Sequence, residues 1–502
     1  MRERPRKADG KRAGDATTLA FLGGARTVTG SKHLVRTAKS QVLLDCGMFQ
    51  GQKELRLRNW RPLPLDPEAV SAVVLSHAHI DHSGALPLLF KQGFRGPVYC
   101  TPATADLLAI LLLDAARLQE EEAAYANRHG YSKHRPALPL YTAEDVEQVW
   151  RLVEVRKRGE WFRVADGVSA RLRQAGHILG SAIVELEIDG PPPRRLVFSG
   201  DLGRWKRPIL HDPEYIDEGD VVLVESTYGD RVHPSDPTSI LAQVVNDTVE
   251  RGGVLIVPAF AVGRTQELVW ALRHLEDTDR IPVVPVFVDS PMASHVTQIY
   301  ARHRDEHDVD MQALTDAQRN PLETRRFELV RSVADSREIG MARGPMIVIA
   351  GSGMATGGRV LHHLRQRLPD ERNTVLLTGF QAAGTRGRSL QDGAKTLRMF
   401  GEEVTVRAKV VALDGFSAHA DRQDILRWLR GFRRAPRKLW LVHGEPEASA
   451  SLCELVEEQL GWNVSVAEDG AMVPLDGDVA AVRERSRHEP SRRAPRRRGA
   501  VR

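Results

Sequence analysis

Residues 76–84 read SHAHIDHSG, directly after VSAVVL at 70–75. The apolar run, rich in branched side chains, predicts a short buried strand. Three imidazoles and a carboxylate in one turn would repel one another if protonated and would be poorly satisfied if buried. A divalent cation removes the problem, because neutral imidazole and carboxylate groups are its common ligands. The stretch therefore predicts a metal site at the end of a strand, with four candidate ligands: His77, His79, Asp81 and His82.

Four candidate ligands exceed what one tetrahedral ion takes from so short a segment, so we expect two neighbouring ions. Further ligands must come from elsewhere, and suitable side chains recur where other apolar strands end. One such residue is weak evidence, because a strand-terminal aspartate often caps a turn. Together the positions repeat one design, with ligands on loops at one end of a sheet. They are Asp45 in VLLDCG (42–47), His177 in QAGHILGS (174–181), Asp201 in VFSGDLG (197–203) and His443 in WLVHGE (440–445).

The order of apolar runs predicts an α/β protein in which one domain interrupts another. The first half is rich in short strands, with a helical region at about 83–150. After residue 212, beginning with DVVLVEST, apolar strands alternate with helices, which is typical of a parallel sheet. Short strands resume near residue 404. We therefore expect one domain formed by 15–211 and 405–482, enclosing a second domain at 212–404.

The net charge of +5 is concentrated at the two ends of the chain. Residues 1–14 carry +4 and residues 483–502 carry +7, which leaves −6 for the body. Arginine-rich segments of this kind are typical of disordered tails. Such tails can contact RNA or DNA phosphates, or only add solubility. Evidence for a nucleic-acid substrate must therefore come from the site.

Cysteine usage and the apolar runs point to the cytoplasm. Cys46, Cys100 and Cys453 are far apart and form no CxxC pair, as expected for reduced thiols. The charged N-terminus is not followed by the apolar stretch of a secretory signal. The longest apolar run, LLAILLL at 107–113, is too short to span a bilayer. We expect a cytoplasmic protein without a membrane partner.

HAHIDH at 77–82 resembles the HxHxDH signature of the metallo-β-lactamase superfamily, and the four strand-end residues match its other motifs in chain order. The resemblance covers residues 17–470. It implies an αββα sandwich and two zinc ions, with manganese as an alternative. A water or hydroxide would complete the bridge between them. One zinc would be held by His77, His79 and His177, the second by Asp81, His82 and His443, with Asp201 bridging both.

Asp45 is expected to lie behind the metal ligands, without binding a metal ion itself. There it would orient a ligand histidine by accepting its other N–H. The large segment between Asp201 and His443 resembles the insert of the β-CASP branch of nucleases. That branch has an acidic residue at the end of the first insert strand, which Glu225 matches. It also has a histidine ahead of the last ligand, which His419 in FSAHAD matches.

FSAHAD closely resembles the motif of RNA 3′-end-processing endonucleases, so the resemblance implies an RNA substrate. Two metal ions about 3.5–4 Å apart can clamp a phosphodiester and lower the pKa of a shared water. The departing oxygen then needs a proton. We expect His419 to be the acid, Glu225 its partner, and Asp81 to be catalytic as well as a ligand. Singly, His419 and Glu225 would be ordinary residues at a helix start and a strand end.

Two further stretches are expected to hold RNA phosphates. GSGMATGGR at 351–359 lies between an apolar strand and an amphipathic helix, where backbone N–H groups with Ser352 and Thr356 can surround an anion. The alternative is an ordinary glycine-rich turn. Arg264, at a helix start, is expected to contact a phosphate, or else to pair with Glu267 in a structural salt bridge.

We therefore expect a zinc-dependent ribonuclease, an endonuclease that hydrolyses single-stranded RNA through a hydroxide bridging the metals and leaves 5′-phosphate and 3′-hydroxyl ends. A 5′-exoribonuclease of the RNase J type and a DNA-repair nuclease are the nearest alternatives. The large insert argues against a small-ester or thioester hydrolase. The complete ligand set argues against a non-catalytic RNA-processing scaffold. The natural RNA and the oligomeric state, including a homodimer, are left open.

Overall fold

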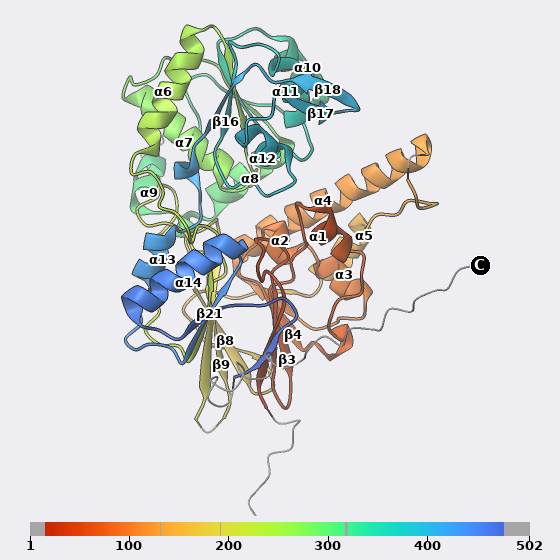
Figure 1. Ribbon diagram of the computed structural model, residues 1–502, viewed down its shortest axis with the longest axis vertical. Coiled ribbons are helices and arrows are strands. Elements are labelled where there is room, and N and C mark those ends of the chain that lie inside the picture. The colour runs from red at the N-terminus through yellow and green to blue at the C-terminus, as the bar shows by residue number, and fades with distance from the viewer. Residues whose placement is uncertain (1–15, 131, 191, 317–319, 476–502) are drawn as a thin grey trace, which may run out of the picture.

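The computed structural model describes residues 16–475, except 131, 191 and 317–319. The predicted basic tails, 1–14 and 483–502, lie outside these residues. The described chain forms two lobes, one above the other in Figure 1. The lower lobe is built from both ends of the described chain, and the upper lobe from its middle.

The lower lobe contains two seven-stranded sheets packed face to face. In the first sheet, the four strands from β3 to β6 run parallel, and the remaining neighbours are antiparallel. Its strands lie in the order β22 (Met472–Pro474), β1 (Thr18–Gly23), β2 (Lys32–Arg36), β3 (Gln41–Leu44), β4 (Ala72–Val74), β5 (Val98–Cys100) and β6 (Val153–Val155).

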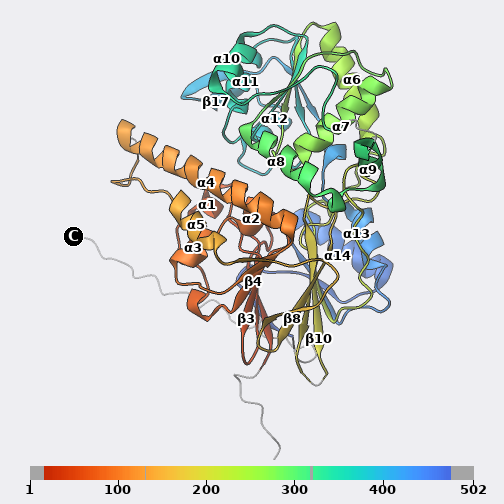
Figure 2. The ribbon, with the colours of Figure 1, turned by 180° about the vertical axis from the view of Figure 1, so that it is seen from behind.

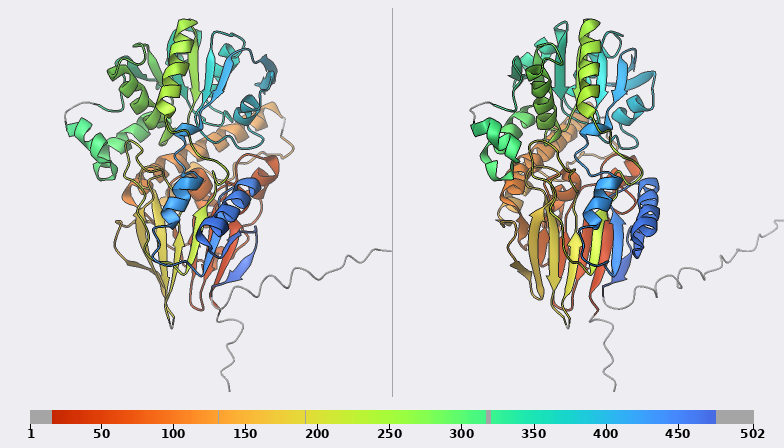
Figure 3. Two further views of the ribbon diagram at one scale, coloured as in Figure 1. Left: turned by 60° about the vertical axis from the view of Figure 1, so that its left-hand side comes forward. Right: turned by 90° about the vertical axis from the view of Figure 1, so that its left-hand side faces the viewer.

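The second sheet lies against the first, and Figure 3 shows the strands of this lobe below the insert. Alternate residues of β8 are fully buried, as expected for a strand with one face in a core. The apolar faces of the two sheets form one core that includes Leu44 and Leu186. The order is β21 (Val464–Val466), β20 (Lys438–Val442), β11 (Val221–Glu225), β10 (Arg194–Phe198), β9 (Ala182–Ile188), β8 (Val168–Gln174) and β7 (Phe162–Ala165).

Helices cover the outer face of each sheet, which completes an αββα sandwich. Against the first sheet pack α2 (Ile80–Ser83), α3 (Leu86–Lys91), α4 (Pro102–His129) and α5 (Ala143–Trp150). Against the second pack α13 (Arg422–Leu429) and α14 (Pro446–Leu460). The outer half of α4 projects beyond the lobe, as Figure 2 shows from behind. The short helix α1 (Lys53–Arg58) precedes β4.

The upper lobe has a six-stranded sheet in which every pair of neighbours is parallel. Its order is β14 (Phe327–Leu329), β13 (Val286–Asp289), β15 (Met346–Ala350), β12 (Val254–Pro258), β16 (Thr374–Leu377) and β19 (Lys409–Ala412). One face packs on α6 (Pro237–Glu250), α7 (Arg264–Asp277) and α8 (Pro291–Arg302). The other packs on α10 (Val333–Met341), α11 (Val360–Arg367) and α12 (Arg386–Gln391). A helix, α9 (Val309–Asp316), and a hairpin of β17 (Thr396–Met399) and β18 (Glu402–Thr405) complete the lobe. The predicted α/β class, with a sandwich interrupted by a mainly parallel sheet, is confirmed.

Sheet membership favours a division that differs in two details from the expected one. The run containing β11 was expected to open the insert, but β11 pairs in parallel with β10 and β20 of the lower lobe. At the other end, β19 was expected to belong to the lower lobe, but it pairs with β16 of the insert. Apolar strands of this kind suit either sheet, and only their long-range partners distinguish the two. We propose that the insert begins after Glu225 and ends near Ala412, in place of 212–404.

Strand direction brings the predicted site residues to one edge of the sandwich. In the second sheet, β8, β10, β11 and β20 run in the same direction, because β9 is antiparallel to both β8 and β10. Their carboxyl ends therefore meet at one edge. In the first sheet, β3 and β4 are likewise parallel to each other. The loops that follow these strands lie next to the insert.

His33, on β2, lies fully buried between Phe21 and Phe198, with ring centroids 5.7 and 5.3 Å away. Burial, with smaller contributions from His82 and His443, lowers the pKa of His33 from 6.5 to about 3. The unfolded chain therefore binds a proton between these pH values that the folded chain excludes, so folding stability falls as the pH falls through this window.

His33→Leu is expected to make the loss of stability between pH 6.5 and pH 4 less steep, by up to about 1.4 kcal/mol per pH unit. The measurement is the free energy of unfolding in urea, at several pH values, for the wild type and the variant. An unchanged slope would show that His33 does not titrate as described.

Two general features of the described residues complete the fold. None of their helices is both long enough and apolar enough to cross a membrane. The three cysteines are all free thiols, with Cys46 and Cys100 buried and Cys453 partly buried.

Candidate metal centre

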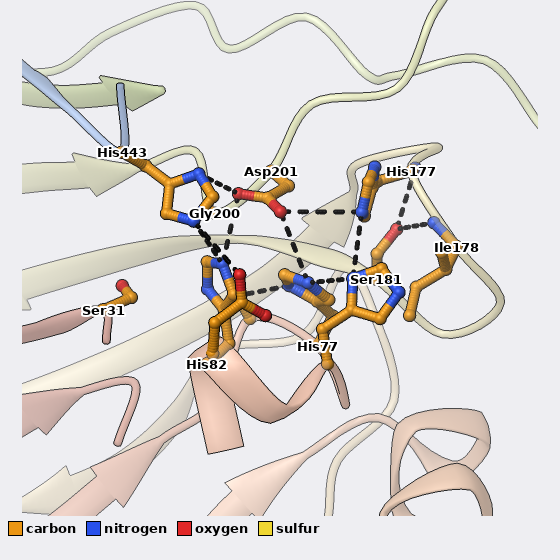
Figure 4. Close-up of polar contacts among 12 residues, drawn as sticks. Ser31, His77, His82, His177, Ile178, Ser181, Gly200, Asp201 and His443 are labelled. Atoms are coloured by element: carbon orange, nitrogen blue, oxygen red, sulfur yellow. Dashed lines mark hydrogen bonds and ion pairs between the residues drawn. The ribbon is translucent and has the colours of Figure 1, made fainter. Parts of the chain in front are cut away.

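The loops at the edge of the sandwich bring the predicted ligands together. His77 and His79 follow β4, while Asp81 and His82 lie in the single turn of α2. His177, Asp201 and His443 follow β8, β10 and β20. Figure 4 shows His77, His82, His177, Asp201 and His443 converging from these different elements. Residues far apart in the sequence thus meet in one cluster.

The first group consists of three histidines and Asp201, with ligand atoms all within 4.8 Å of one another. The Nδ1 atom of His79 lies 3.0 Å from Nε2 of His77 and 3.3 Å from Nε2 of His177. Asp201 Oδ2 lies 3.5 Å from Nε2 of both His77 and His177. Three imidazole nitrogens and one carboxylate oxygen therefore point at a common centre.

The second group shares the same aspartate through its other oxygen. Asp201 Oδ1 lies 3.3 Å from His82 Nε2 and 3.2 Å from His443 Nδ1. His443 Nε2 lies 3.1 Å from His82 Nε2 and 3.5 Å from Asp81 Oδ2. The carboxylate of Asp201 thus lies between the two groups, where it can serve both.

These distances suit cations. Zinc bonds of about 2.0–2.1 Å in tetrahedral geometry place neighbouring ligand atoms roughly 3.3–3.4 Å apart, and the separations of 3.0–3.5 Å in the first group are close to this. Asp201 Oδ1 is buried and has no hydrogen-bond partner among the described residues. A buried carboxylate oxygen without a donor is costly unless it is ionically paired. Nitrogen-rich donors with carboxylates are the set that divalent transition metals prefer.

The protonation of the first group favours metal binding. Burial, together with neighbouring histidines, lowers the pKa of His77 and His177 well below the ordinary value. Burial also lowers the pKa of His79 to about 4. All three imidazoles are therefore neutral at physiological pH, as metal ligands must be. Burial opposes a charge on His82 as well, but Asp201 and Asp45 raise its pKa well above the ordinary value. A cation would replace that positive charge.

Asp45, directly after β3, lies behind His82 of the second ligand group. Its Oδ2 is 2.7 Å from His82 Nδ1 and accepts a hydrogen bond from Ser76 Oγ at 2.9 Å. Its Oδ1 accepts from the backbone N–H of Ser76 at 2.7 Å. Ser76 Oγ is in turn 3.0 Å from His77 Nδ1. The network holds the planes of the His77 and His82 rings, and the orienting role of Asp45 toward metal ligands stays a prediction.

His419 lies beside the cluster, in the loop before α13. Its Nδ1 is 3.0 Å from Glu225 Oε2, 3.2 Å from Glu225 Oε1 and 3.8 Å from Asp201 Oδ2. Burial lowers the pKa of His419, but the charges of Glu225 and Asp201 outweigh it and raise that pKa to about 9. Glu225 is itself fully buried and accepts a hydrogen bond from the backbone N–H of Leu202. A protonated imidazole therefore stands next to the cluster.

The cluster opens into a large cleft, of about 2170 Å³, lined by both lobes. His79, Asp81 and His419 contribute to one side, while the insert contributes loops after β12 and β15. Phe260 lines this cleft with 38% of its surface exposed. Its ring lies close against Gly353, where a Cβ atom would lie 2.6 Å from the ring. The cleft thus presents an aromatic face as well as the cluster.

The two predicted phosphate-binding stretches also line the cleft. Ser352 Oγ lies 3.0 Å from Thr356 Oγ1 and accepts from the backbone N–H of Thr356 at 3.1 Å. Arg264 starts α7 and is buried, and its Nη1 donates to Glu267 Oε2 at 3.1 Å. Glu267 also pairs with Arg207. The structural salt bridge left open for Arg264 is therefore present, and a phosphate contact stays a prediction.

Several residues that contact the candidate ligands or line the cleft were not predicted from the sequence. Thr227 Oγ1 lies 3.3 Å from His443 Nδ1, two residues beyond Glu225. Ser31 Oγ donates to Asp45, and Ser181 Oγ accepts from the backbone N–H of His177. Ser76 and Ser181 lie inside the motifs SHAHIDHSG and QAGHILGS, so the sequence already shows that they are close to the candidate ligands. Nothing in the sequence distinguishes Ser31 or Phe260 from other residues of their type.

Comparison with known proteins covers nearly the whole described chain. Family models match a beta-lactamase superfamily domain at 40–250, a beta-Casp domain at 265–390, and a Zn-dependent metallo-hydrolase RNA specificity domain at 403–467. A solved structure, titled as a protein of unknown function from Enterococcus faecalis V583, covers 92% of this chain and 100% of its own at a TM-score of 0.52. At 14% identity it supports the fold alone.

Three curated relatives are closer in sequence. Ribonuclease TTHA0252 of Thermus thermophilus is 40% identical over 90% of this chain and 99% of its own length. Transcription termination factor FttA of Methanosarcina mazei is 34% identical over 88% and 69%. The RNase J-like protein of Methanocaldococcus jannaschii is 32% identical over 91% and 99%. Fold and site together are those of the metallo-β-lactamase superfamily. Within it, the chain belongs to the β-CASP family, which confirms the resemblance drawn from HAHIDH and FSAHAD.

Proposed function

We propose that the protein is a zinc-dependent ribonuclease that cleaves single-stranded RNA internally and leaves 5′-phosphate and 3′-hydroxyl ends. The observation that carries the proposal is the juxtaposition, at one edge of the cleft, of two ligand groups sharing Asp201 with the ion pair of His419 and Glu225. A metal centre alone would suit many hydrolases. The buried acid beside it, within a cleft between two lobes, suits an extended phosphodiester.

The ligand residues are assigned as the sequence indicated. His77, His79 and His177 would hold one cation, Asp81, His82 and His443 the other, and Asp201 both. When bound, two such cations lower the pKa of a shared water and offset negative charge on the phosphate. Asp81, with a side chain 22% exposed, borders the cleft, where it would accept a proton from the attacking water.

His419 supplies the proton that the departing 3′ oxygen requires. Glu225 accepts from Nδ1, which leaves Nε2 as the atom that donates to substrate. The same carboxylate stabilises the imidazolium and holds the ring plane. Because Glu225 is fully buried, its orientation does not depend on solvent. Proton donation opposite the attacking water is the geometry that in-line displacement at phosphorus requires.

The matched proteins and the lining of the cleft both support RNA as the substrate. The names of two relatives contain ribonuclease or RNase, and one matched domain is described by RNA specificity. Single-stranded nucleic acids bind where basic groups follow the backbone and aromatic rings stack on bases. Lining side chains of both kinds are present: Arg56, Arg264, Arg359, Arg386 and Phe260. The glycine-rich loop with Ser352 and Thr356 would add contacts to phosphate.

Phe260→Ala is expected to weaken binding of single-stranded RNA by roughly 5- to 100-fold, because stacking on one base contributes about 1–3 kcal/mol. Phe260→Trp should retain most of the affinity, since an aromatic face remains. Fluorescence anisotropy of a labelled RNA, with cleavage prevented by chelation, measures the affinity. Phe400→Ala is a matched control, because that ring is exposed but does not line the cleft. Equal affinities for wild type and Phe260→Ala would remove Phe260 from the binding surface.

The mode of cleavage is tested with one uniform single-stranded RNA, labelled at its 5′ end in one sample and at its 3′ end in another. Internal fragments from both labels at early times are expected. Immediate release of a labelled mononucleotide from the 5′ end would instead establish the exonuclease. DNA of the same sequence and an RNA duplex serve as comparisons, and either being cleaved as fast would contradict the proposed preference.

A further inference from the structure

The loop that carries His177 is held partly by the insert. Residues 176–181 belong to the lower lobe, between β8 and β9. Yet Ile178 and Leu179 pack in one apolar core with Val262 and Tyr300 of the insert. The contact is close, because a Cβ atom added at Gly263 would lie 3.1 Å from Ile178 Cγ2. Figure 4 shows Ile178 and Ser181 directly beside His177.

Hydrogen bonds within the loop define the position of His177. Ser181 Oγ accepts from the backbone N–H groups of His177 and Ile178, at 3.0 and 3.3 Å. The carbonyl of Gly180 accepts from the hydroxyls of Thr101 and Thr104 at the start of α4. Ser181 is therefore the residue through which the loop positions His177.

An ion pair between the two lobes reaches this same residue. Arg158, between β6 and β7, donates from Nη2 to the carbonyl of Ser181 at 2.9 Å. Its Nη1 donates to Oε1 of Glu306, which lies in the short 3₁₀ turn Arg304–Glu306 of the insert. The side chain of Glu306 is 3% exposed and that of Arg158 is 21% exposed. The two contacts use separate nitrogens of the forked guanidinium, a geometry that the single nitrogen of a lysine does not reproduce.

A second polar contact between the lobes does not reach the loop. Asp106, on α4, lies 2.9 Å from His303 Nε2 and 3.6 Å from Arg302 Nη2 of the insert. This contact joins the same two lobes through neighbouring insert residues. Among the described residues, it makes no hydrogen bond to residues 176–181. It therefore separates the effect of joining the lobes from the effect of holding the loop.

We propose that Arg158 and Glu306 are positioning residues through which the insert fixes the His177 loop, so that the first ligand group is complete only when the insert is seated against it. Neither residue lines the cleft or belongs to a ligand group, and the pair acts through Ser181. Partners behind metal ligands commonly change metal affinity by about 10–100-fold. The inference uses the ligand assignment of the proposed function but not its substrate.

The test compares Glu306→Gln, Arg158→Lys and the control Asp106→Asn, each as the full chain. Zinc affinity and stoichiometry are measured by competition with a chromogenic chelator. Amide hydrogen exchange is measured over 176–181 in the presence and absence of zinc. Neither measurement involves RNA, so a failure of the ribonuclease proposal leaves both results interpretable.

Glu306→Gln and Arg158→Lys are expected to weaken one of the two zinc sites by about 10–100-fold and to speed exchange over 176–181. Asp106→Asn should resemble the wild type in both measurements. Unchanged zinc affinity and exchange in the first two variants would overturn the proposal, as would equal effects in all three. If Glu306→Gln does not fold, Arg158→Lys, which keeps the charge, decides the matter by the same criteria.

Discussion

Asp201→Asn is expected to lower the rate of RNA cleavage by about 10³-fold and to reduce the metal content of the protein. Asp201 is the one residue that both ligand groups share. Its Oδ2 faces His77 and His177, and its Oδ1 faces His82 and His443. The amide has the same shape but no charge, and one of its two ends presents hydrogens where an acceptor is needed.

The expected loss has two measurable parts. Metal per chain is determined by elemental analysis after dialysis, and the rate by single-turnover cleavage of a labelled RNA. Asp166→Asn is the matched control, because that side chain is 66% exposed and paired only at the surface. It should keep both metal and rate. A variant at Asp201 that retains two metals and the full rate would refute the bridging assignment.

His419→Ala is expected to lower the cleavage rate by about 10²–10⁴-fold while leaving metal content and RNA affinity nearly unchanged. The imidazole lies 3.8 Å from Asp201 and belongs to neither of the two ligand groups, although it forms a separate cluster with Asp201 and Glu225. Its role as an acid predicts a selective effect on substrates whose leaving group needs a proton. Glu225→Gln should cause a smaller loss, since the ring keeps a hydrogen-bond partner but loses the charge that stabilises the imidazolium.

A substrate with sulfur in place of the departing 3′ oxygen distinguishes acid catalysis from positioning. A thiolate leaves without protonation, so His419→Ala should cleave this RNA at close to the wild-type rate. The control His129→Ala alters an exposed histidine whose ring contacts that of Tyr125, and it should behave as wild type on both substrates. An equal loss on the oxygen and sulfur substrates would assign His419 a structural role instead.

The cluster of candidate metal ligands could be predicted because its signals are local. HAHIDH places four of them within six positions, and the other three end apolar runs that predict strands. Parallel strands carry such ends to one edge of a sheet, so the cluster follows from pattern and topology together. His419 and Glu225 needed a family motif, because either residue alone has an ordinary structural explanation.

Long-range pairing set the limit of prediction. The apolar run of β11 suits either sheet, and its neighbours are β10, nearby in sequence, and β20, more than 200 residues away. Arg158 and Glu306 are 148 positions apart and belong to no motif. Phe260 becomes notable only because it lines the cleft beside Gly353. These relations arise from the packing of the two lobes.

The proposal of a ribonuclease with two zinc ions is tested most directly by the recovery of ribonuclease activity as zinc is returned to chelator-treated protein. One single-stranded RNA, labelled at either end, is incubated with protein carrying zero, one, two and three equivalents of zinc per chain. We expect no cleavage without metal, internal cleavage that rises until two equivalents are bound, and no further rise with a third. Cleavage by metal-free protein at the full rate, or no cleavage of RNA by protein with two bound zinc ions, would contradict the proposal.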